Sequence, residues 1–170
     1  VLTLRNNAAL NGNNTINNAT LYLGSNLTAP DYSAYTFTGA GSYLSYTGAG
    51  PFTFTLPTSA SLTRSGAGYT YVYDNLVNDG TVTVSGGGNL QFQSGTTLSN
   101  TAGATTTVTG TGSTLQLYGL ANAGTLTADN SGLIQLTGTF TTAGLGTVTL
   151  SNGGTVRLTG TVTNTSANLT

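Results

Sequence analysis

Short apolar segments recur at nearly constant intervals along the second half of the chain, and a turn-forming polar residue follows most of them two positions later. The apolar residues that mark this recurrence are spaced by 22, 22, 20 and 22 residues: Leu76, Leu98, Leu120, Phe140 and Val162. A fixed period of this length is typical of a solenoid, in which each repeat forms one coil of a stack.

Within one repeat, apolar and polar residues alternate. After Phe140, for example, Val148 and Leu150 form one apolar pair, and Val156 and Leu158 form another. Alternation with a period of two indicates a strand with one buried face, and the Gly, Asn and Ser residues between the pairs suit tight turns. The pattern predicts three short strands per coil of about 20–22 residues. The equivalent inward pairs of the other repeats are Val82/Val84 with Leu90/Phe92, Thr107/Thr109 with Leu115/Leu117, and Leu126/Ala128 with Ile134/Leu136.

The fold expected from this pattern is an all-β, right-handed parallel β-solenoid, or β-helix. No segment holds the apolar stripe of a helix, so no helix is expected. The handedness follows from the preference for right-handed connections between parallel strands. The regular β-solenoid covers residues 76–170, and residues 1–18 repeat the same spacings as an N-terminal solenoid coil.

Residues 19–75 interrupt the regular period and hold most of the aromatic residues. Two interpretations stay open for this region: an irregular aromatic-rich β insertion that projects from the solenoid, which is slightly favoured, or two to three irregular coils. Alternating Tyr and Thr suits a half-buried sheet face, but tyrosines also suit a subunit interface or a glycan-binding platform. The tyrosines considered for an interface are Tyr43, Tyr46, Tyr69, Tyr71 and Tyr73.

Amide side chains form two predicted structural ladders, because they recur at equivalent places in successive coils and stacked amides can bond to one another. For both ladders, solubility and turn chemistry are favoured over recognition of a ligand. The first ladder lies between the inward residues of one strand, where Arg157 continues the column of Gln91, Gln116 and Gln135. The second lies at one corner, where Thr142 interrupts the column of Asn78, Asn100, Asn122 and Asn164.

Thr-x-Thr triplets point their threonines outward in several coils. Flat threonine arrays on solenoids can bind ice, but the column is interrupted at Thr106-Thr107-Val108. Since threonine is also an ordinary β-former, a structural role is favoured. The triplets are Thr81/Thr83, Thr125/Thr127 and Thr147/Thr149.

Composition argues against several classes of function. Only 4% of residues are charged and the formal net charge is −1, so binding to nucleic acid through phosphate neutralisation is not expected. No apolar run is long enough for a membrane span, and the lack of cysteine excludes disulfides and thiolate ligands.

No enzyme activity and no cofactor are expected, because the only acids are four aspartates and the chain has no Lys, Glu or His to move protons. Asp74 and Asp79 offer oxygens of the kind that calcium takes, but turn formation is the favoured role for both.

Two pairs of segments, Gly124–Ala128 with Gly132–Gly138 and Gly146–Leu150 with Gly154–Gly160, resemble the β-strand repeats of bacterial autotransporter and filamentous-haemagglutinin-like surface proteins. The resemblance covers residues 76–170 and the first eighteen residues. It implies the β-solenoid fold, an extracellular or cell-surface location, and a role as a stalk or in adhesion.

Neither end of the predicted solenoid carries a charged or proline-blunted cap, and an uncapped end is an open sheet edge. The leading functional expectation is a structural subunit of an extracellular filament, a homopolymer built head-to-tail. An equally weighted explanation of the uncapped ends is that the chain is part of a longer protein. Alternative functions are an adhesin or stalk segment that binds surface glycans through the tyrosine-rich region, and a trimer like a phage tail spike. The end residues expected at a head-to-tail interface are Leu2, Leu4, Leu10, Ile16, Val162 and Leu169.

Overall fold

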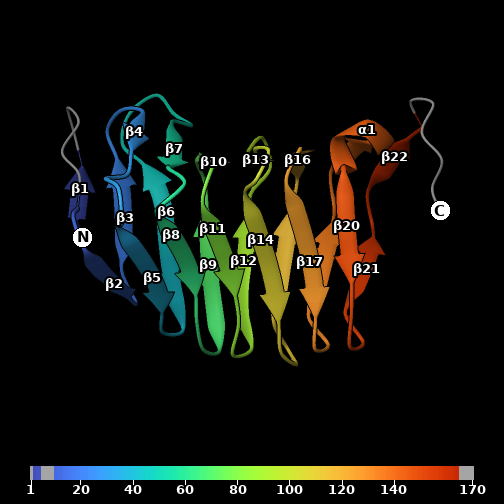
Figure 1. The fold of residues 1–170 in the computed structure, drawn as a ribbon. Coiled ribbons are helices and arrows are strands. Elements are labelled where there is room, and N and C mark those ends of the chain that lie inside the picture. Colours follow the sequence, from blue (N-terminus) through green and yellow to red (C-terminus); the bar gives the residue numbers. More distant parts are fainter. Residues whose placement is uncertain (1, 5–9, 165–170) are drawn as a thin grey trace.

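The computed structural model describes residues 2–4 and 10–164, so Leu169 lies outside the described residues. These residues form a parallel β-solenoid of about 7 turns. Successive strands along the chain rotate through an eight-stranded, a five-stranded and a seven-stranded sheet, and two strands near the C-terminus form a separate two-stranded sheet. Figure 1 shows the coils side by side, from the N-terminal coil at one end to the C-terminal coil at the other.

The strands of the eight-stranded sheet, in spatial order, are β1 (Leu2–Leu4), β3 (Thr20–Leu23), β6 (Gly41–Tyr46), β9 (Gly68–Val72), β12 (Gly88–Phe92), β15 (Thr114–Leu117), β18 (Leu133–Leu136) and β21 (Thr155–Leu158). Those of the seven-stranded sheet are β2 (Asn13–Asn17), β5 (Ala34–Thr38), β8 (Ser61–Arg64), β11 (Thr81–Val84), β14 (Thr105–Thr109), β17 (Thr125–Asp129) and β20 (Thr147–Leu150). The five-stranded sheet contains β4 (Leu27–Thr28), β7 (Thr53–Leu56), β10 (Asn75–Asn78), β13 (Thr97–Asn100) and β16 (Gly119–Asn122), and β19 (Thr139–Thr141) pairs separately with β22 (Thr161–Thr163).

The register between coils follows the predicted repeat. Leu76 pairs with Leu98, and Leu98 with Leu120, in parallel ladders. In the last two coils Phe140 pairs with Val162 in the same way. The predicted parallel β-solenoid, with three strands per coil, is therefore confirmed.

Residues 19–75 form coils of the same stack. Their strands pair in register with the later strands, as Phe54 does with Leu76. The region is irregular because its connections are longer: 27 residues separate Phe37 from its partner Arg64, but only 20 separate Arg64 from Val84. Of the two interpretations left open by the sequence, irregular coils describe this region, and the favoured projecting insertion does not.

The core is a file of inward side chains from all three sheets. Large fully buried members include Phe37, Phe54, Leu76 and Phe92. These side chains alternate with outward polar ones along each strand, as the period of two predicts.

One predicted inward pair is wrong. The side chains of β14 that pair with Val82 and Val84 are Thr106 and Val108, and not Thr107 and Thr109. The turn before β14 is longer than the equivalent turns before β11 and β17. Because β14 has threonines on both faces, the sequence offered no contrast between apolar and polar residues from which to choose the inward face. A shift of one residue exchanges the two faces of a strand, so the prediction named the wrong pair.

A single helical turn, α1 (Thr142–Leu145), corrects the expectation that the chain has no helix. The Thr141 hydroxyl caps it by accepting from the Gly144 N–H at 3.0 Å. Four residues are too few to show a helical stripe in sequence. Among the described residues, no helix has the length and apolar character needed to cross a bilayer.

Candidate functional surfaces

The asparagine column forms a hydrogen-bonded ladder inside the solenoid. The Asn78 side-chain amide donates to Asn100 Oδ1 at 2.8 Å, and that of Asn100 donates to Asn122 Oδ1 at 3.2 Å. All three side chains are buried. The sequence placed this column at an outward corner, so its buried position is a correction. The amides point inward because a corner carbonyl and an amide neighbour satisfy them there.

The same amides fix the strands of the seven-stranded sheet. Each donates to the carbonyl of the threonine that begins the next strand of that sheet in the following coil, with N···O distances of 3.0, 3.2 and 3.0 Å, in the pairs Asn78–Thr105, Asn100–Thr125 and Asn122–Thr147. Thr106, which faces the core, donates its hydroxyl to Asn100 Oδ1 at 2.8 Å. The ladder therefore joins the start of β14, β17 and β20 to the coils before them.

The ladder changes its chemistry at the C-terminal coils. Asn122 donates to the Leu145 carbonyl of α1 at 2.9 Å. One coil later the Thr142 hydroxyl takes the place of an amide and donates to Asn164 Oδ1 at 3.2 Å. Thr142 interrupts the asparagine column in the sequence, but its hydroxyl continues the hydrogen-bonded ladder.

The glutamine column lies on the outside of the eight-stranded sheet. Gln91, Gln116 and Gln135 are in register, but in the described part of the chain their amides make no hydrogen bond to one another. Only the last of them has a side-chain partner in the column, because Arg157 donates to Gln135 Oε1 at 3.0 Å. The column is therefore aligned but not linked into a continuous ladder.

Three of the five singled-out tyrosines form a stack on the same outer face. The rings of Tyr43 and Tyr71 are stacked with centroids 5.5 Å apart, and those of Tyr71 and Tyr69 with centroids 5.8 Å apart. Tyr43 is 37% exposed and Tyr69 is 46% exposed. We call these three residues the tyrosine stack. Tyr73, two residues after Tyr71 in the chain, is also exposed.

Tyr46 belongs to a different environment. Its ring packs edge-on against Phe52, with centroids 6.4 Å apart, and any side chain at Gly50 would overlap it. The tyrosines also lie on the side of the solenoid, whereas the other interface candidates that the structure describes lie at its ends. The structure thus divides the predicted interface residues among separate surfaces.

The N-terminal end presents a hollow lined by apolar and polar residues. Leu2 and Leu10 line it together with Ile16, and its volume is about 380 Å³. Leu4 and Ile16 are themselves buried, whereas Leu2 is exposed.

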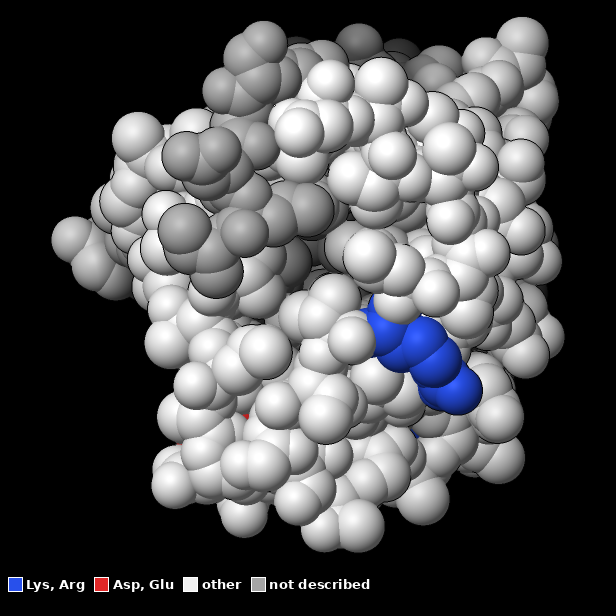
Figure 2. Space-filling model, turned by 90° about the vertical axis from the view of Figure 1, so that its right-hand side faces the viewer, with Lys and Arg blue, Asp and Glu red and all other residues white. Residues whose placement is uncertain are grey.

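At the C-terminal end, two side chains at core-facing positions of the last coil are partly exposed. Leu150 and Leu158 are 52% and 53% exposed, although their partners one coil earlier, Ala128 and Leu136, are 0% and 2% exposed. Val162 is half-buried. Figure 2 views the molecule from this side and shows a surface nearly free of charge, apart from one basic spot.

The outer face of the seven-stranded sheet carries aligned threonines without the predicted interruption. Thr105 and Thr107 pair with Thr81 and Thr83 of the preceding coil, so the triplet of β14 is one residue earlier than expected. The columns continue through β17 and β20. We call the following eight residues the threonine face: Thr81, Thr83, Thr105, Thr107, Thr125, Thr127, Thr147 and Thr149.

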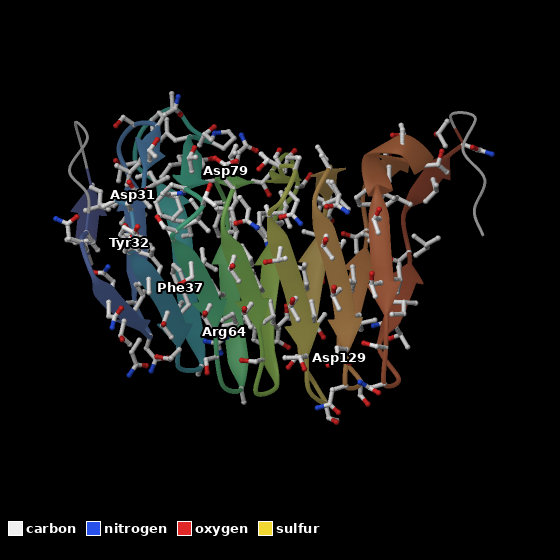
Figure 3. All side chains as sticks on the ribbon, viewed as in Figure 1. Asp31, Tyr32, Phe37, Arg64, Asp79 and Asp129 are labelled. Carbon is white, nitrogen blue, oxygen red and sulfur yellow. The ribbon has the colours of Figure 1, made fainter. Side chains whose placement is uncertain are left out.

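The four aspartates are dispersed. Figure 3 shows Asp129 at one corner of the solenoid, far from Asp31 and Asp79. The Asp129 carboxylate accepts from the Ser151 hydroxyl at 2.6 Å and the Asn152 amide at 2.8 Å, which lower its pKa. In the described ranges, no three acidic, His or Cys residues are grouped so as to hold a metal ion.

Asp74 and Asp79 do not form the calcium site considered from the sequence, because β10 separates them and a strand rises about 3.3 Å per residue. Asp79 accepts from the Thr101 hydroxyl at 2.7 Å. Asp74 is buried, and desolvation raises its pKa to about 6 against the opposing effect of the Phe52 N–H.

Arg64 is a buried cation that sequence reasoning missed. It occupies an inward position of β8, between Phe37 and Val84 of the neighbouring coils. Its Nη2 donates to the carbonyls of Gly39 and Ala67 at 2.7 and 2.8 Å, while Nε and Nη1 have no hydrogen-bond partner among the described residues. Burial lowers its pKa. The sequence did offer one signal: Arg64 lies two residues after Leu62, and residues two apart in a strand face the same side.

Comparisons with family models, with curated proteins and with solved structures found no match.

Proposed function

We propose that this protein is a structural subunit of an extracellular or cell-surface filament, in which the C-terminal coil of one copy stacks on the N-terminal coil of the next. The observation that carries the proposal is the half-exposed state of Leu150 and Leu158, whose partners one coil earlier are buried. The resemblance of the repeats to those of bacterial surface proteins supports the location.

The sheet edges supply the second part of the argument. The eight-stranded sheet ends in β1 and β21, and the seven-stranded sheet ends in β2 and β20. Because the strands within each sheet are parallel, β21 of one copy can pair with β1 of the next without reversing direction. The same holds for β20 and β2. Such a head-to-tail contact does not close on itself and therefore gives a filament.

The energetic gain comes from apolar burial and strand pairing. Removing the remaining exposed half of each of the two leucines from water contributes about 1 kcal/mol per side chain. Figure 2 shows one basic patch on the described surface of this end, so this end brings few charges into the proposed contact.

Sedimentation velocity and electron microscopy of the purified chain over a range of concentrations test this proposal. We expect unbranched polymers that lengthen as concentration rises. Leu158→Asp should abolish them, because it places a carboxylate in the proposed interface. Thr155→Asp is the matched control, since this exposed side chain of the same strand points outward. A chain that stays monomeric at every concentration, or that forms only a closed trimer, would contradict the filament.

A second candidate function, an adhesin or stalk segment that binds glycans, is favoured by the tyrosine stack. Exposed aromatic rings offer apolar area with little loss of side-chain entropy, and the rings of Tyr43, Tyr69 and Tyr71 lie in contact on one outer face. A glycan array probed with the wild-type chain, Tyr71→Ala and the control Thr127→Ala, on the outer face of a different sheet, tests it. Binding lost only in Tyr71→Ala supports adhesion, and an array without signal for the wild-type chain removes it.

A further inference from the structure

The threonine face is a regular array of hydroxyl and methyl groups on four successive coils. Its two columns are in register through β11, β14, β17 and β20. Figure 1 shows these strands side by side along the stack. Neighbouring parallel strands lie about 4.8 Å apart, and side chains two residues apart in a strand are about 6.6 Å apart. The face is therefore a two-dimensional lattice with fixed repeats.

Most hydroxyls of the threonine face are available to a ligand. Within the described part of the chain, the one side-chain hydrogen bond among these eight residues joins Thr81 and Thr105, at 3.4 Å. The first threonine of each strand is exposed, as in Thr125 and Thr147. The other hydroxyls can therefore bond to water or to a ligand.

Two features keep the array ordered. Threonine is β-branched, so its side-chain rotamers are restricted and the methyl and hydroxyl positions repeat from coil to coil. Beneath the face, the asparagine ladder holds the backbone carbonyls of Thr105, Thr125 and Thr147. A buried and satisfied polar network of this kind makes the strands rigid.

The face also lacks the charges that would hold water in a different arrangement. None of its eight members is charged, and the nearby Asp129 at the end of β17 is bound by Ser151 and Asn152. A single sugar or peptide would contact only a few of these positions and gain nothing from the repeat. A ligand whose surface is itself periodic can contact all eight threonines at once. Ice is such a ligand, because its oxygen lattice has a repeat close to the spacing of parallel strands.

We propose that the threonine face binds ice, as an activity separate from end-to-end assembly. The methyl groups and hydroxyls order water into positions compatible with the ice lattice, and the adsorbed protein then stops local growth of the crystal. Although β20 is also the end strand of its sheet, its threonines face outward and away from the apolar contact proposed between copies, so the two proposals can fail separately.

The test is thermal hysteresis, crystal shape and incorporation into a growing ice hemisphere, measured for the purified chain. Thr107→Tyr with Thr127→Tyr places two bulky groups at the centre of the face. The matched control is Gln116→Tyr with Gln135→Tyr, which changes the next strand of the same two coils on another face. Each variant is also measured in combination with Leu158→Asp, which should keep the protein monomeric, so that differences in polymer length do not affect the ice measurements.

We expect the wild-type chain and the glutamine control to shape ice crystals and show thermal hysteresis. The threonine double variant should lose more than about tenfold of that activity, as for a change at the centre of a binding surface. Circular dichroism and thermal melting check that each variant is folded. If the tyrosines disturb the fold, Thr107→Lys with Thr127→Lys serves as the second variant. Wild-type protein without hysteresis, shaping or incorporation, or equal loss in the control, overturns the proposal.

Discussion

Asp74 shows how one ionisable side chain inside the solenoid makes stability depend on pH. Its carboxyl group is buried, Oδ1 accepts from the Phe52 N–H at 2.8 Å, and Oδ2 has no hydrogen-bond partner in the part of the chain that the structure describes. Burial disfavours the charged form and raises the pKa from 3.8 to about 6. The folded protein therefore holds this proton over a range in which the unfolded chain has released it.

The sign of the resulting effect is definite. With the folded-state pKa above the unfolded one, the stability contribution is fully present below about pH 4 and is lost as pH rises through about 6. The loss is about 3 kcal/mol. We expect Asp74→Asn to flatten the dependence of unfolding free energy on pH between pH 4 and 7, measured by chemical denaturation. Asp31→Asn, at an exposed turn, should keep the wild-type slope; an unchanged slope in Asp74→Asn would contradict this account.

At the scale of elements, the asparagine ladder links neighbouring strands of the five-stranded sheet to one another and to strands of the seven-stranded sheet. Asn100 lies in β13 and bonds to Asn78 of β10, Asn122 of β16, and both Thr106 and Thr125 of the seven-stranded sheet. One side chain therefore joins four strands from three coils and satisfies buried polar groups on each of them.

Asn100→Leu should be strongly destabilising, because it leaves the Thr106 hydroxyl and the Thr125 carbonyl without these partners in the interior. The expected loss is about 3 kcal/mol, measured by denaturant unfolding. Gln116→Leu, in a column without bonds between its amides, should change stability by less than about 0.5 kcal/mol. Equal effects of the two substitutions would show that the ladder contributes nothing beyond packing.

At the scale of the whole molecule, each coil contacts mainly its neighbours, so stability varies along the axis. Central strands such as β11 and β12 are covered by coils on both sides. The last coil has only one neighbour in the described residues, and its inward residues Leu150 and Leu158 are half exposed.

Native-state hydrogen exchange should reveal this gradient. In monomeric Leu158→Asp, we expect the amides of β20, β21 and β22 to exchange faster than those of β11 and β12, because local opening at an end breaks fewer contacts. In the wild-type chain under polymerising conditions, the end strands should become protected. Uniform exchange along the monomer would contradict the gradient.

The repeat of about 22 residues and the alternation within it determined the parallel solenoid from sequence alone. Residues such as Leu76, Leu98 and Leu120 contrast sharply with their polar neighbours, so their spacing reports which side chains stack. The column of Asn78, Asn100 and Asn122 was visible for the same reason, because a regular coil length repeats every position together.

The tertiary structure decided what this contrast did not encode. Strand pairing between coils uses backbone groups, so β5 and β8 stack despite 27 residues between partners, which no fixed period reveals. In β14, threonine on both faces left the register open, and only pairing with β11 aligned the threonine face. The side chains of the asparagines and of Arg64 point inward because carbonyl groups of the surrounding coils accept hydrogen bonds from them there. Those acceptors are in place only once the stack has formed.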